Sequence, residues 1–451
     1  METIIAFCKR KGFVFPSSEI YDGLAGVYDF GPNGSLLMKN IKRAFTQKTV
    51  QEQRNFFEID AGMFKNPKVW EASGHVGGFS DPLADCRVCQ ARIRVDKELE
   101  KVGVSADEKM SEAEINELFD KHRDQIACPN CGSKDFSPAR AFNLLVTSNL
   151  GDFAGRGEHP VYLPGEACQG IYLNFKNVVD TMHPKIPFGI AQIGKAFRNE
   201  ISPRQFLFRT REFEQADTQL FIKPGTNAEH FEQTKIARMQ WYTELGIDPQ
   251  HLRFSDHDNL VFYAAAATDI EYDFPDYGFD EVEGVHDRTD YDLTQHSKHS
   301  GVDLSYNDNG EKFIPYIIET SMGLARVFLA LISEAYDEEQ LEDGDSRIVL
   351  RLQPALAPVR VAVMPLMKKD GLLEKSEQVY ADLAKHFSVR LEESGSVGKR
   401  YRRQDEIGTP FCVTVDYDTL EDETVTIRFR DSMEQQRVAI NELAEFIRKR
   451  S

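Results

Sequence analysis

The sequence predicts an α+β protein in which helices flank an antiparallel sheet and a smaller α/β module follows at the C-terminus. Two runs rich in β-branched and aromatic residues, 188–197 and 212–221, lie close together in the chain and predict an antiparallel hairpin. After a proline-containing connector at 354–358, strand and helix patterns alternate over 359–451, which is typical of a compact α/β module. The length of 451 residues also favours more than one domain.

The other elements are predicted from apolar periodicity and from the turn residues between the runs. Before the connector we expect, in order, a long amphipathic helix over 32–54, a strand over 56–59, strands from 142 onward that include 171–175, a helix over 227–245, a strand over 314–319 and a helix over 324–332. Beyond the connector we expect a strand over 359–364, a helix over 377–384, strands over 411–416 and 424–429, and a helix over 439–449.

The first chemical motif lies at the tip of the predicted hairpin. Arg198 and Glu200 are two positions apart, so on a strand their side chains point to the same face. A guanidinium there can bind a phosphate through two N–H groups, and the carboxylate can accept from an amine. The loop that follows adds Pro203, Arg204 and Arg209, whose positive charge could fold over bound phosphates. The alternative is an exposed, salt-bridged hairpin, because arginines beside glutamates are common on protein surfaces.

The second motif is Gly323-Leu324-Ala325-Arg326, at the start of a predicted apolar helix. Arg326 falls in the first turn, where the backbone N–H groups already favour anions. Together with Arg198 it indicates a shared anionic ligand. The alternative is a core helix that is unrelated to the hairpin.

Four of the seven cysteines form two Cys-x-x-Cys pairs, Cys86/Cys89 and Cys128/Cys131. Each pair can place two thiolates on one side of a tetrahedral Zn²⁺, and Gly132 suits the tight turn of a zinc knuckle. A polar helical stretch over 111–123 lies between the pairs, so we expect an insertion over about 85–138 held together by structural zinc. Disulfides are not expected in a reducing cytosol. The three other cysteines have apolar neighbours and are interpreted as packing residues: Cys8, Cys168 and Cys412.

The formal net charge of −19 argues against a protein that coats nucleic acid nonspecifically. Positive charge is nevertheless concentrated locally in a basic cluster with an aromatic residue inside it, followed by arginines on a predicted strand. We interpret these residues as RNA contacts, with a solvated loop as the alternative: Arg400, Tyr401, Arg402, Arg403, Arg428 and Arg430.

Membrane and secretory classes are not favoured by the sequence. No apolar run approaches the roughly 18 residues that a spanning helix requires. The first residues place Glu2 and the basic residues 9–11 around a very short apolar piece, which lacks the order of charge, apolar core and cleavage site of a signal peptide. We therefore expect a cytoplasmic protein without a membrane partner.

At this point the chain resembles the class II aminoacyl-tRNA synthetases, whose second motif is a Phe-Arg-x-Glu hairpin and whose third is a Gly-x-x-Arg helix start. Within that family it is most similar to the homodimeric glycyl type, and the likeness runs nearly from end to end. Further matching segments are 11–21, 73–76, 169–176, 288–293 and 401–410. Their shared order along the chain makes coincidence an inadequate explanation.

The resemblance implies a class II synthetase domain over 1–353, with the zinc-knuckle insertion at about 85–138 and a second, helical or irregular insertion at about 225–310. A linker at 354–358 and an anticodon-binding domain at 359–451 would follow. The implied reaction is ATP-dependent attachment of glycine to tRNA(Gly) through a glycyl-adenylate, with Mg²⁺ bridging phosphates. The segment 32–59 resembles the first class II motif and implies a homodimer.

The resemblance also implies residue roles at the nucleotide. Arg198 would contact the α-phosphate, Arg326 the γ-phosphate, and Phe213 would stack on the adenine, while Glu281 could also hold Mg²⁺. With Glu200, the two arginines form the implied catalytic set. The full implied ATP site is Arg198, Asn199, Glu200, Phe208, Arg209, Thr210, Arg211, Glu212, Phe213, Glu281, Val282, Gly323, Leu324, Ala325 and Arg326. Without the resemblance, Phe213 and Val282 are interpreted as core residues.

Glycine has no side chain to recognise, so its site must bind the ammonium and carboxylate and leave no space at the α-carbon. The residues implied for it are Arg94, Glu166, Phe213, Glu214, Gln215, Ala216, Asp217, Glu319, Thr320, Ser321, Met322 and Gly323. The chain departs from the family at three places. Asp217 replaces a glutamate, Pro164-Gly165 stand where relatives have an arginine, and Thr320 replaces a proline.

Two rival functions are weighed against this prediction. One is a class II synthetase for another small amino acid, which the carboxylates at Glu166 and Glu319 do not favour. The other is a noncatalytic nucleic-acid-binding protein on a synthetase fold. Such a protein is expected to have lost the phosphate-binding arginines, whereas both Arg198 and Arg326 are present.

Overall fold

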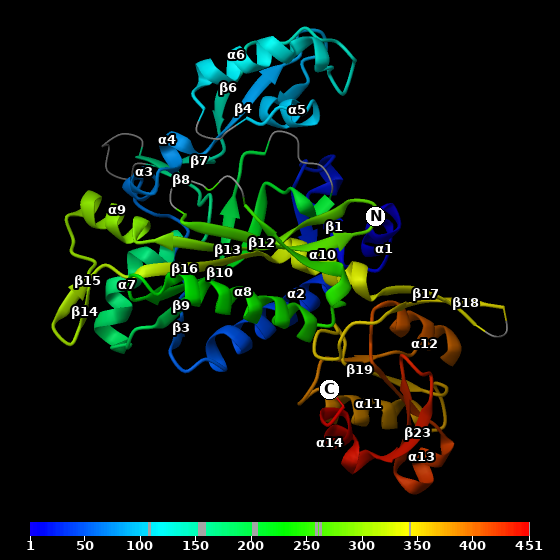
Figure 1. The fold of residues 1–451 in the computed structure, drawn as a ribbon. Coiled ribbons are helices and arrows are strands. Elements are labelled where there is room, and N and C mark those ends of the chain that lie inside the picture. The colour runs from blue at the N-terminus through cyan, green and yellow to red at the C-terminus, as the bar shows by residue number, and fades with distance from the viewer. Residues whose placement is uncertain are drawn as a thin grey trace.

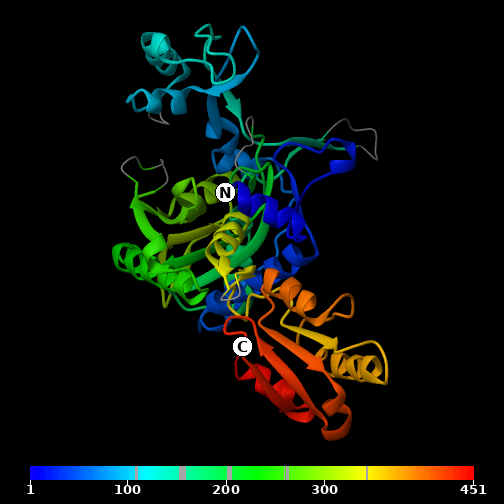
Figure 2. The same ribbon diagram turned by 90° about the vertical axis from the view of Figure 1, so that its right-hand side faces the viewer.

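The computed structural model describes residues 1–106, 110–151, 159–200, 206–257, 260, 264–341 and 344–450. A central body built on one large sheet lies between two smaller lobes (Figures 1 and 2). The insertion with α5 and α6 projects from one side, and the C-terminal domain lies on the opposite side. Among the described residues, no helix is long and apolar enough to cross a membrane.

The central sheet has seven strands in the order β11-β12-β13-β16-β10-β9-β3. All neighbours pair antiparallel except β3 and β9, which are parallel. The predicted hairpin is confirmed as β9 and β10. The strands are β3 Phe56–Glu58, β9 Phe188–Phe197, β10 Glu212–Ile222, β11 Leu252–Asp256, β12 Ala266–Phe274, β13 Gly278–Thr289 and β16 Tyr316–Gly323.

Three helices cover one face of this sheet: α2 Pro32–Thr46, α8 Asn227–Glu244 and α10 Leu324–Ala335. Their apolar side chains pack with every second residue of the strands, including Ala216 and Met322, in the largest core cluster. The helix predicted from Gly323 onward is confirmed as α10. The helix predicted over 32–54 ends earlier as an α-helix and continues as a π-helical turn at Gln47–Gln51.

One predicted strand is wrong. Residues 171–175 lie inside helix α7, Gln169–Met182, rather than in a strand. The apolar residues Ile171, Tyr172, Phe175 and Val178 recur at helical spacing and are buried against β9 and β10. A short apolar run is compatible with either a strand or a helix when it covers little more than one helical turn, and tertiary packing decides which of the two forms.

The segment 225–310 also differs from the helical or irregular insertion that was expected. It begins with α8 but then supplies β11, β12 and β13, which extend the central sheet, before α9 Tyr291–Ser300. Charged residues interrupt the apolar alternation of these strands, because their outer face carries polar groups.

The insertion has a small core of its own, which includes Leu99, Ile115, Phe119 and Phe136. Its three-stranded sheet has the order β5-β4-β6 and carries two helices. Ser111 and Glu114 form a reciprocal capping box at the start of the second helix. The elements are β4 Ser80–Asp85, β5 Arg92–Arg94, α5 Val95–Lys101, α6 Glu112–His122 and β6 Arg140–Asn143.

The C-terminal domain is the expected α/β module, with a five-stranded sheet in the order β20-β19-β21-β22-β23. Its core is separate from that of the central body. The last helix starts later than predicted, because 435–439 form a strand. The elements are β19 Val361–Pro365, α11 Leu372–Leu383, β20 Val389–Leu391, α12 Val397–Glu406, β21 Phe411–Val415, α13 Tyr417–Asp422, β22 Thr424–Phe429, β23 Gln435–Ala439 and α14 Leu443–Arg448.

Shorter elements complete the described chain. The hairpin β17–β18 leads from α10 to the connector, where Asn40 of α2 donates to the carbonyls of Leu356 and Ala357. The remaining helices and strands are α1 Glu2–Arg10, β1 Val14–Pro16, β2 Tyr28–Phe30, α3 Lys68–Ala72, α4 His75–Gly78, β7 Thr147–Leu150, β8 His159–Tyr162, β14 Tyr306–Asp308, β15 Glu311–Phe313, β17 Tyr336–Gln340 and β18 Ser346–Leu350.

Candidate active site

The sheet face opposite α2, α8 and α10 gathers polar side chains. Strand alternation places every second residue there, and the pairing brings Asp217 opposite Gln192 and Ser321. Glu319 lies opposite Gln219. Side chains from three strands therefore converge on one polar surface.

Arg198 continues from β9 onto this surface. Its guanidinium carbon lies 5.2 Å from the ring centroid of Phe79 and 5.3 Å from that of Phe213, so the cation lies close to two aromatic rings. Nε donates to the carbonyl of Gly165 over 3.2 Å. These contacts hold the side chain near the hairpin tip, where a planar donor group suits a phosphate or carboxylate.

Glu200 lies beside Arg198 at the hairpin tip. Its carboxylate is 3.7 Å from Nε of Arg209, and its carbonyl accepts from Nε of Arg211 over 2.9 Å. The backbone of Asn199 is also anchored, because its N–H donates to the carbonyl of Leu144. Residues 201–205, which include the expected loop residues Pro203 and Arg204, lie outside the described residues.

Arg326 is held in the first turn of α10. Nη1 donates to the backbone carbonyl of Glu281 over 2.8 Å and to its carboxylate over 3.0 Å, while Nε donates to the carbonyl of Phe208 over 3.3 Å. The Glu281 side chain is 45% exposed, so an anion or a metal ion can reach the same carboxylate and guanidinium. The sheet places β13 and the start of α10 side by side, and this brings the two predicted residues together.

Glu166 lies over the sheet face beside α7. Gln169 donates to its Oε1 over 2.7 Å, and Nε2 of His75 lies 3.6 Å from its Oε2. Burial acts to raise the pKa of Glu166, but His75, Arg288 and Gln169 outweigh that effect and hold the pKa well below its usual range. Glu166 is therefore an ionised carboxylate in a nearly buried position.

Glu319 is the second ionised carboxylate of the group. It accepts from Arg288 over 2.9 Å and from Gln219 over 2.9 Å, and Nδ1 of His286 lies 3.1 Å away. Burial opposes ionisation, yet Arg288 and His286 together lower the pKa of Glu319 to about 2. Arg288 is itself fixed by two donations to Asp292, at 2.7 and 3.0 Å.

Asp217 differs from both, because the residue is 0% exposed and, among the described residues, no group lies within hydrogen-bonding geometry of either carboxylate oxygen, although Ser321 lies beside them. Burial, with the nearby charges of Glu319 and Glu166, raises the pKa of Asp217 well above its usual range. A buried carboxyl group without a partner is costly in a native protein unless a ligand satisfies it. Its place beside two ionised carboxylates makes a cationic group the ligand that fits.

Several residues predicted for the two substrates lie on the other face of the sheet or in the core. Strand alternation turns Ala216, Thr320 and Met322 away from Asp217, and Glu214 binds Lys42 of α2 over 2.7 Å. Val282, Leu324 and Ala325 are buried in the core cluster. Gln215 is on the polar face and its side chain accepts from the backbone N–H of Ala167 over 3.1 Å.

The remaining predicted residues surround the hairpin tip. Phe208 packs its ring against Phe274, with centroids 4.4 Å apart. Thr210 is buried, Glu212 pairs with Lys195, and Gly323 ends β16 at the start of α10. Arg94 lies in the insertion, where it binds Asp96 over 2.5 Å and Asp81 over 3.2 Å.

The sequence reasoning assigned no role to four polar residues of this surface: Gln169, Gln192, Gln219 and Arg288. Each reaches the carboxylate group through hydrogen bonds or cross-strand pairing. Arg288 lies at the end of β13 and Asp292 in the first turn of α9, and an arginine and an aspartate four positions apart at this strand-to-helix junction were a usable signal for an ion pair.

The four predicted zinc ligands come together in the insertion. The sulfur atoms of Cys86, Cys89, Cys128 and Cys131 all lie within 4.8 Å of one another. In each Cys-x-x-Cys turn a backbone N–H closes back onto the first cysteine: Gln90 onto Cys86 over 2.9 Å and Gly132 onto Cys128 over 2.8 Å. Gly132 has φ +72°, which its lack of a Cβ permits. The donor set and its spacing fit a tetrahedral Cys₄ site, which could bind zinc.

The predicted RNA contacts in the C-terminal domain divide into two groups. Arg400, Arg428 and Arg430 are each at most 5% exposed and hydrogen-bond to carbonyls or carboxylates within the protein. Tyr401 shares a hydrogen bond with Thr414 over 2.6 Å. In the second group, Arg402 is partly exposed and Arg403 is 44% exposed and pairs with Glu392 over 2.9 Å.

Comparison with known proteins agrees with this geometry. Residues 152–336 match the family described as "tRNA synthetase class II core domain (G, H, P, S and T)", and residues 360–450 match "Anticodon binding domain". The chain is 50% identical to the glycine–tRNA ligase of Clostridium tetani over 99% of its own length and 97% of the relative. It is equally identical to those of Geobacillus thermodenitrificans and Clostridium perfringens, over 100% of its length and 97% and 98% of theirs.

Proposed function

Because the chain belongs to the glycine–tRNA ligases, a family of class II aminoacyl-tRNA synthetases, we propose that it attaches glycine to tRNA(Gly) at the expense of ATP. Glycine is first activated as glycyl-adenylate, and the glycyl group is then transferred to a hydroxyl of the terminal adenosine of the tRNA, with AMP as the leaving group. The observation that carries the glycine assignment is the buried Asp217, which has no hydrogen-bond partner among the described residues and lies beside the ionised Glu166 and Glu319.

In the first step the glycine carboxylate attacks the α-phosphorus of ATP and pyrophosphate leaves. The chain supplies no nucleophile for this step, so positioning and charge neutralisation are what the site contributes. Arg198, held near Phe79 and Phe213, binds the α-phosphate region. Arg326, at the start of α10, binds the far phosphates, and its partner Glu281 would hold Mg²⁺, which would supply further charge neutralisation there.

The carboxylates recognise glycine by its ammonium group. Asp217 accepts hydrogen bonds from the ammonium directly. The bound substrate thereby supplies the buried carboxylate with a charge-assisted hydrogen bond. Glu166 and Glu319 add negative charge that attracts the ammonium. Hydrogen bonds from Gln169 and Arg288 already fix these two carboxylates in place, so they also form a rigid wall of the site. Larger amino acids are excluded because any side chain must collide with this filled surface.

In the second step the terminal adenosine reaches the glycyl-adenylate while the C-terminal domain holds the anticodon. The exposed Arg403 and the partly exposed Arg402 are the contacts of that domain that the geometry favours. The buried Arg400, Arg428 and Arg430 shape the domain from within. Unstacked bases and phosphates are the groups that such a surface recognises.

The proposed assembly is a cytoplasmic homodimer with one structural zinc ion per chain. The zinc is held by Cys86, Cys89, Cys128 and Cys131. The dimer interface includes the segment 32–59, which carries α2 and β3 and resembles the first class II motif. Sedimentation at micromolar concentration tests the dimer, and a monomer there would overturn it.

The decisive experiment is amino-acid-dependent exchange of labelled pyrophosphate into ATP. We expect exchange with glycine and none above background with alanine, serine or proline. Exchange with alanine or serine at a rate close to that of glycine would show that the carboxylate group does not select glycine. Absence of exchange with every amino acid would favour the noncatalytic alternative.

Metal analysis tests the zinc site separately. The chain purified without chelators should contain one zinc ion, and Cys128→Ala should lose it because a tetrahedral site is left with three ligands. Cys412→Ala is the matched control, because Cys412 is a buried cysteine outside the cluster and its loss should leave the zinc content unchanged. A metal-free native chain that takes up no added zinc would contradict the assignment.

A further inference from the structure

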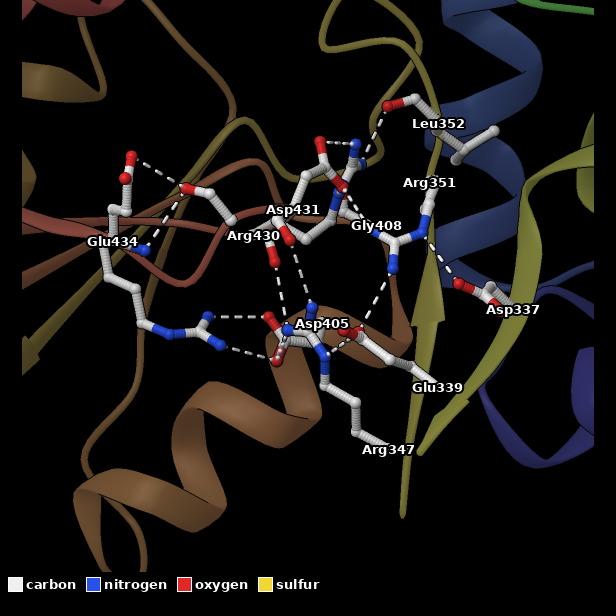
Figure 3. Close-up of polar contacts among 12 residues, drawn as sticks. Asp337, Glu339, Arg347, Arg351, Leu352, Asp405, Gly408, Arg430, Asp431 and Glu434 are labelled. Atoms are coloured by element: carbon white, nitrogen blue, oxygen red, sulfur yellow. Dashed lines mark hydrogen bonds and ion pairs between the residues drawn. The ribbon is translucent and has the colours of Figure 1, made fainter. Parts of the chain in front are cut away.

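An ionic network joins the central body to the C-terminal domain at the hairpin β17–β18. This hairpin directly follows α10, the helix that carries Arg326. Its far side contacts the end of α12 and the turn between β22 and β23 (Figure 3). The hairpin therefore connects the helix of the phosphate site with the domain that matches the anticodon-binding family.

Arg347 of β18 is the centre of this contact, and its side chain is 0% exposed. Nε donates to Glu339 on the same hairpin over 2.6 Å. Nη1 donates across the domain boundary to Asp405 over 3.1 Å and to the carbonyl of Arg430 over 3.0 Å, and Nη2 donates to the carbonyl of Asp431 over 3.3 Å. Every nitrogen of the guanidinium is thus engaged, on both sides of the boundary.

The C-terminal domain also contributes arginines to this contact. Arg428 donates to both oxygens of Asp405, at 2.8 and 3.0 Å. Arg430 pairs with Asp431 and also donates back across the boundary to the carbonyl of Leu352 over 2.8 Å. The contact is therefore made in both directions.

Arg351 extends the contact toward solvent, with donations to Asp337 over 2.9 Å, Glu339 over 3.2 Å and Asp431 over 3.3 Å. The connected side chains balance in charge, four arginines against four carboxylates. We call this set the interdomain network: Asp337, Glu339, Arg347, Arg351, Asp405, Arg428, Arg430 and Asp431.

Buried ion pairs add little to stability compared with an apolar contact of the same size, but their bonds are directional. A guanidinium that reaches acceptors on two domains accepts only a narrow range of angles between them. Weaker contacts of the same boundary agree with a fixed arrangement, because Lys11 binds Glu406 over 2.5 Å and Arg390 donates to Asn33 over 3.0 Å. What the network supplies is orientation.

We propose that the interdomain network fixes the C-terminal domain relative to the active site so that one tRNA engages both, and that Arg347 is a positioning residue for tRNA charging with no part in glycine activation. The proposal rests on the proposed function. A tRNA bound at two places gains affinity only when the spacing of the sites matches its shape. If only a fraction of molecules holds the competent arrangement, the apparent affinity falls by that fraction.

The test compares two reactions of the full chain carrying Arg347→Met. Methionine keeps an unbranched side chain at this position but has no guanidinium. Glycine-dependent pyrophosphate exchange should stay within about twofold of the native rate, while KM for tRNA(Gly) should rise about tenfold, as a competent fraction of one tenth requires. For Arg347→Lys, KM for tRNA(Gly) should lie between the values of the native chain and of Arg347→Met, because one ammonium cannot reach all the acceptors. Small-angle scattering should show a broader distribution of interdomain distances in Arg347→Met.

Arg253→Met is the matched control, because Arg253 pairs with Glu271 within the central body. It should change neither reaction. If Arg347→Met does not fold, Arg347→Met/Glu339→Gln removes one charge of each sign and keeps the remaining network balanced. An unchanged KM for tRNA in the folded variant overturns the proposal, and so does an equal loss in both reactions. A native chain without glycine-dependent exchange would instead defeat the proposed function itself.

Discussion

Two groups of arginines in this protein look alike in the sequence and differ in the fold. Arg198 and Arg326 are half-buried at the edge of the polar sheet face, where they contact aromatic rings, backbone carbonyls and the exposed carboxylate of Glu281. Arg347 and Arg428 are buried at the domain boundary and bind the fully buried Asp405. The first pair can exchange its partners for a ligand, whereas the second pair cannot do so without exposing Asp405.

The difference shows that an arginine's role depends on what already satisfies it. A buried cation must be paired inside the protein, because leaving water without compensation is costly. A partly exposed cation held by carbonyls and rings keeps its charge available to a phosphate. We therefore expect substitutions in the first group to reduce glycine activation, and substitutions in the second to leave activation intact while they reduce stability or tRNA charging.

The largest effect is expected for Arg198→Ala. Removal of a positioned cation from a transferring phosphoryl group typically costs about 10³-fold in rate. Glycine-dependent pyrophosphate exchange should fall by that factor, with the melting temperature nearly unchanged because the Arg198 side chain makes a single hydrogen bond within the described part of the chain, to the carbonyl of Gly165. Arg437→Ala, which removes the ion pairs with Asp416 and Asp422 within the C-terminal domain, is the control for loss of an arginine. Exchange above a tenth of the native rate in Arg198→Ala would contradict this role.

Asp405→Ala should have the second largest effect, on stability rather than on exchange. It leaves Arg347 and Arg428 buried without their shared carboxylate, which costs about 3 kcal/mol. Chemical denaturation followed by circular dichroism measures the loss. Asp382→Ala is the control, because Asp382 forms an exposed pair with Lys385 and its loss should not change the midpoint. A native midpoint for Asp405→Ala would mean that the boundary relaxes around the missing charge.

The third prediction concerns pH. Burial and neighbouring carboxylates raise the pKa of Asp217, so below that pKa the group is neutral and binds an ammonium poorly. KM for glycine should therefore fall as pH rises toward the raised pKa, by up to about tenfold per unit, and level off above it. Glu319, with its pKa lowered to about 2, stays ionised throughout and does not contribute to the slope.

Asp217→Asn separates this effect from titration of His286, which faces the neighbouring carboxylate of Glu319. The variant should have a higher KM for glycine and a flatter pH profile. Steady-state exchange kinetics between pH 6 and 8 measure both. A variant that keeps the native slope would assign the titration to a histidine instead.

The smallest effect is expected for Arg403→Ala, the exposed arginine of α12. A single phosphate contact contributes mainly to the salt dependence of binding, so the slope of log affinity for tRNA against log salt should decrease by about one. Stability should not change, because exposed ion pairs contribute little. Lys385→Ala, an exposed cation on another part of the domain, should leave the slope unchanged. Equal slopes for both variants would remove Arg403 from the tRNA surface.

The local elements were predictable where the sequence period was unambiguous. The hairpin β9–β10, the helix α10 and the strands β21 and β22 follow from apolar alternation and from glycine at a helix start. Helix α7 was mistaken for a strand because only five of its residues were considered, and the apolar positions that define its period extend to Val178. The late strands β12 and β13 were missed because their outer face is polar.

The sequence by itself determined the fold class and the family, and it named the groups that we propose for the site: the arginines of the two motifs, the carboxylates proposed for the ammonium and the four cysteines of the insertion. Only the tertiary structure decided which of these groups are available. It left Asp217 without a hydrogen-bond partner in the described part of the chain, fixed Glu319 with Arg288 and buried Arg428 against Asp405. The physical reason is that residue type sets what a side chain can bind, while burial and long-range partners, which join strands and domains distant in the chain, set whether it is already bound.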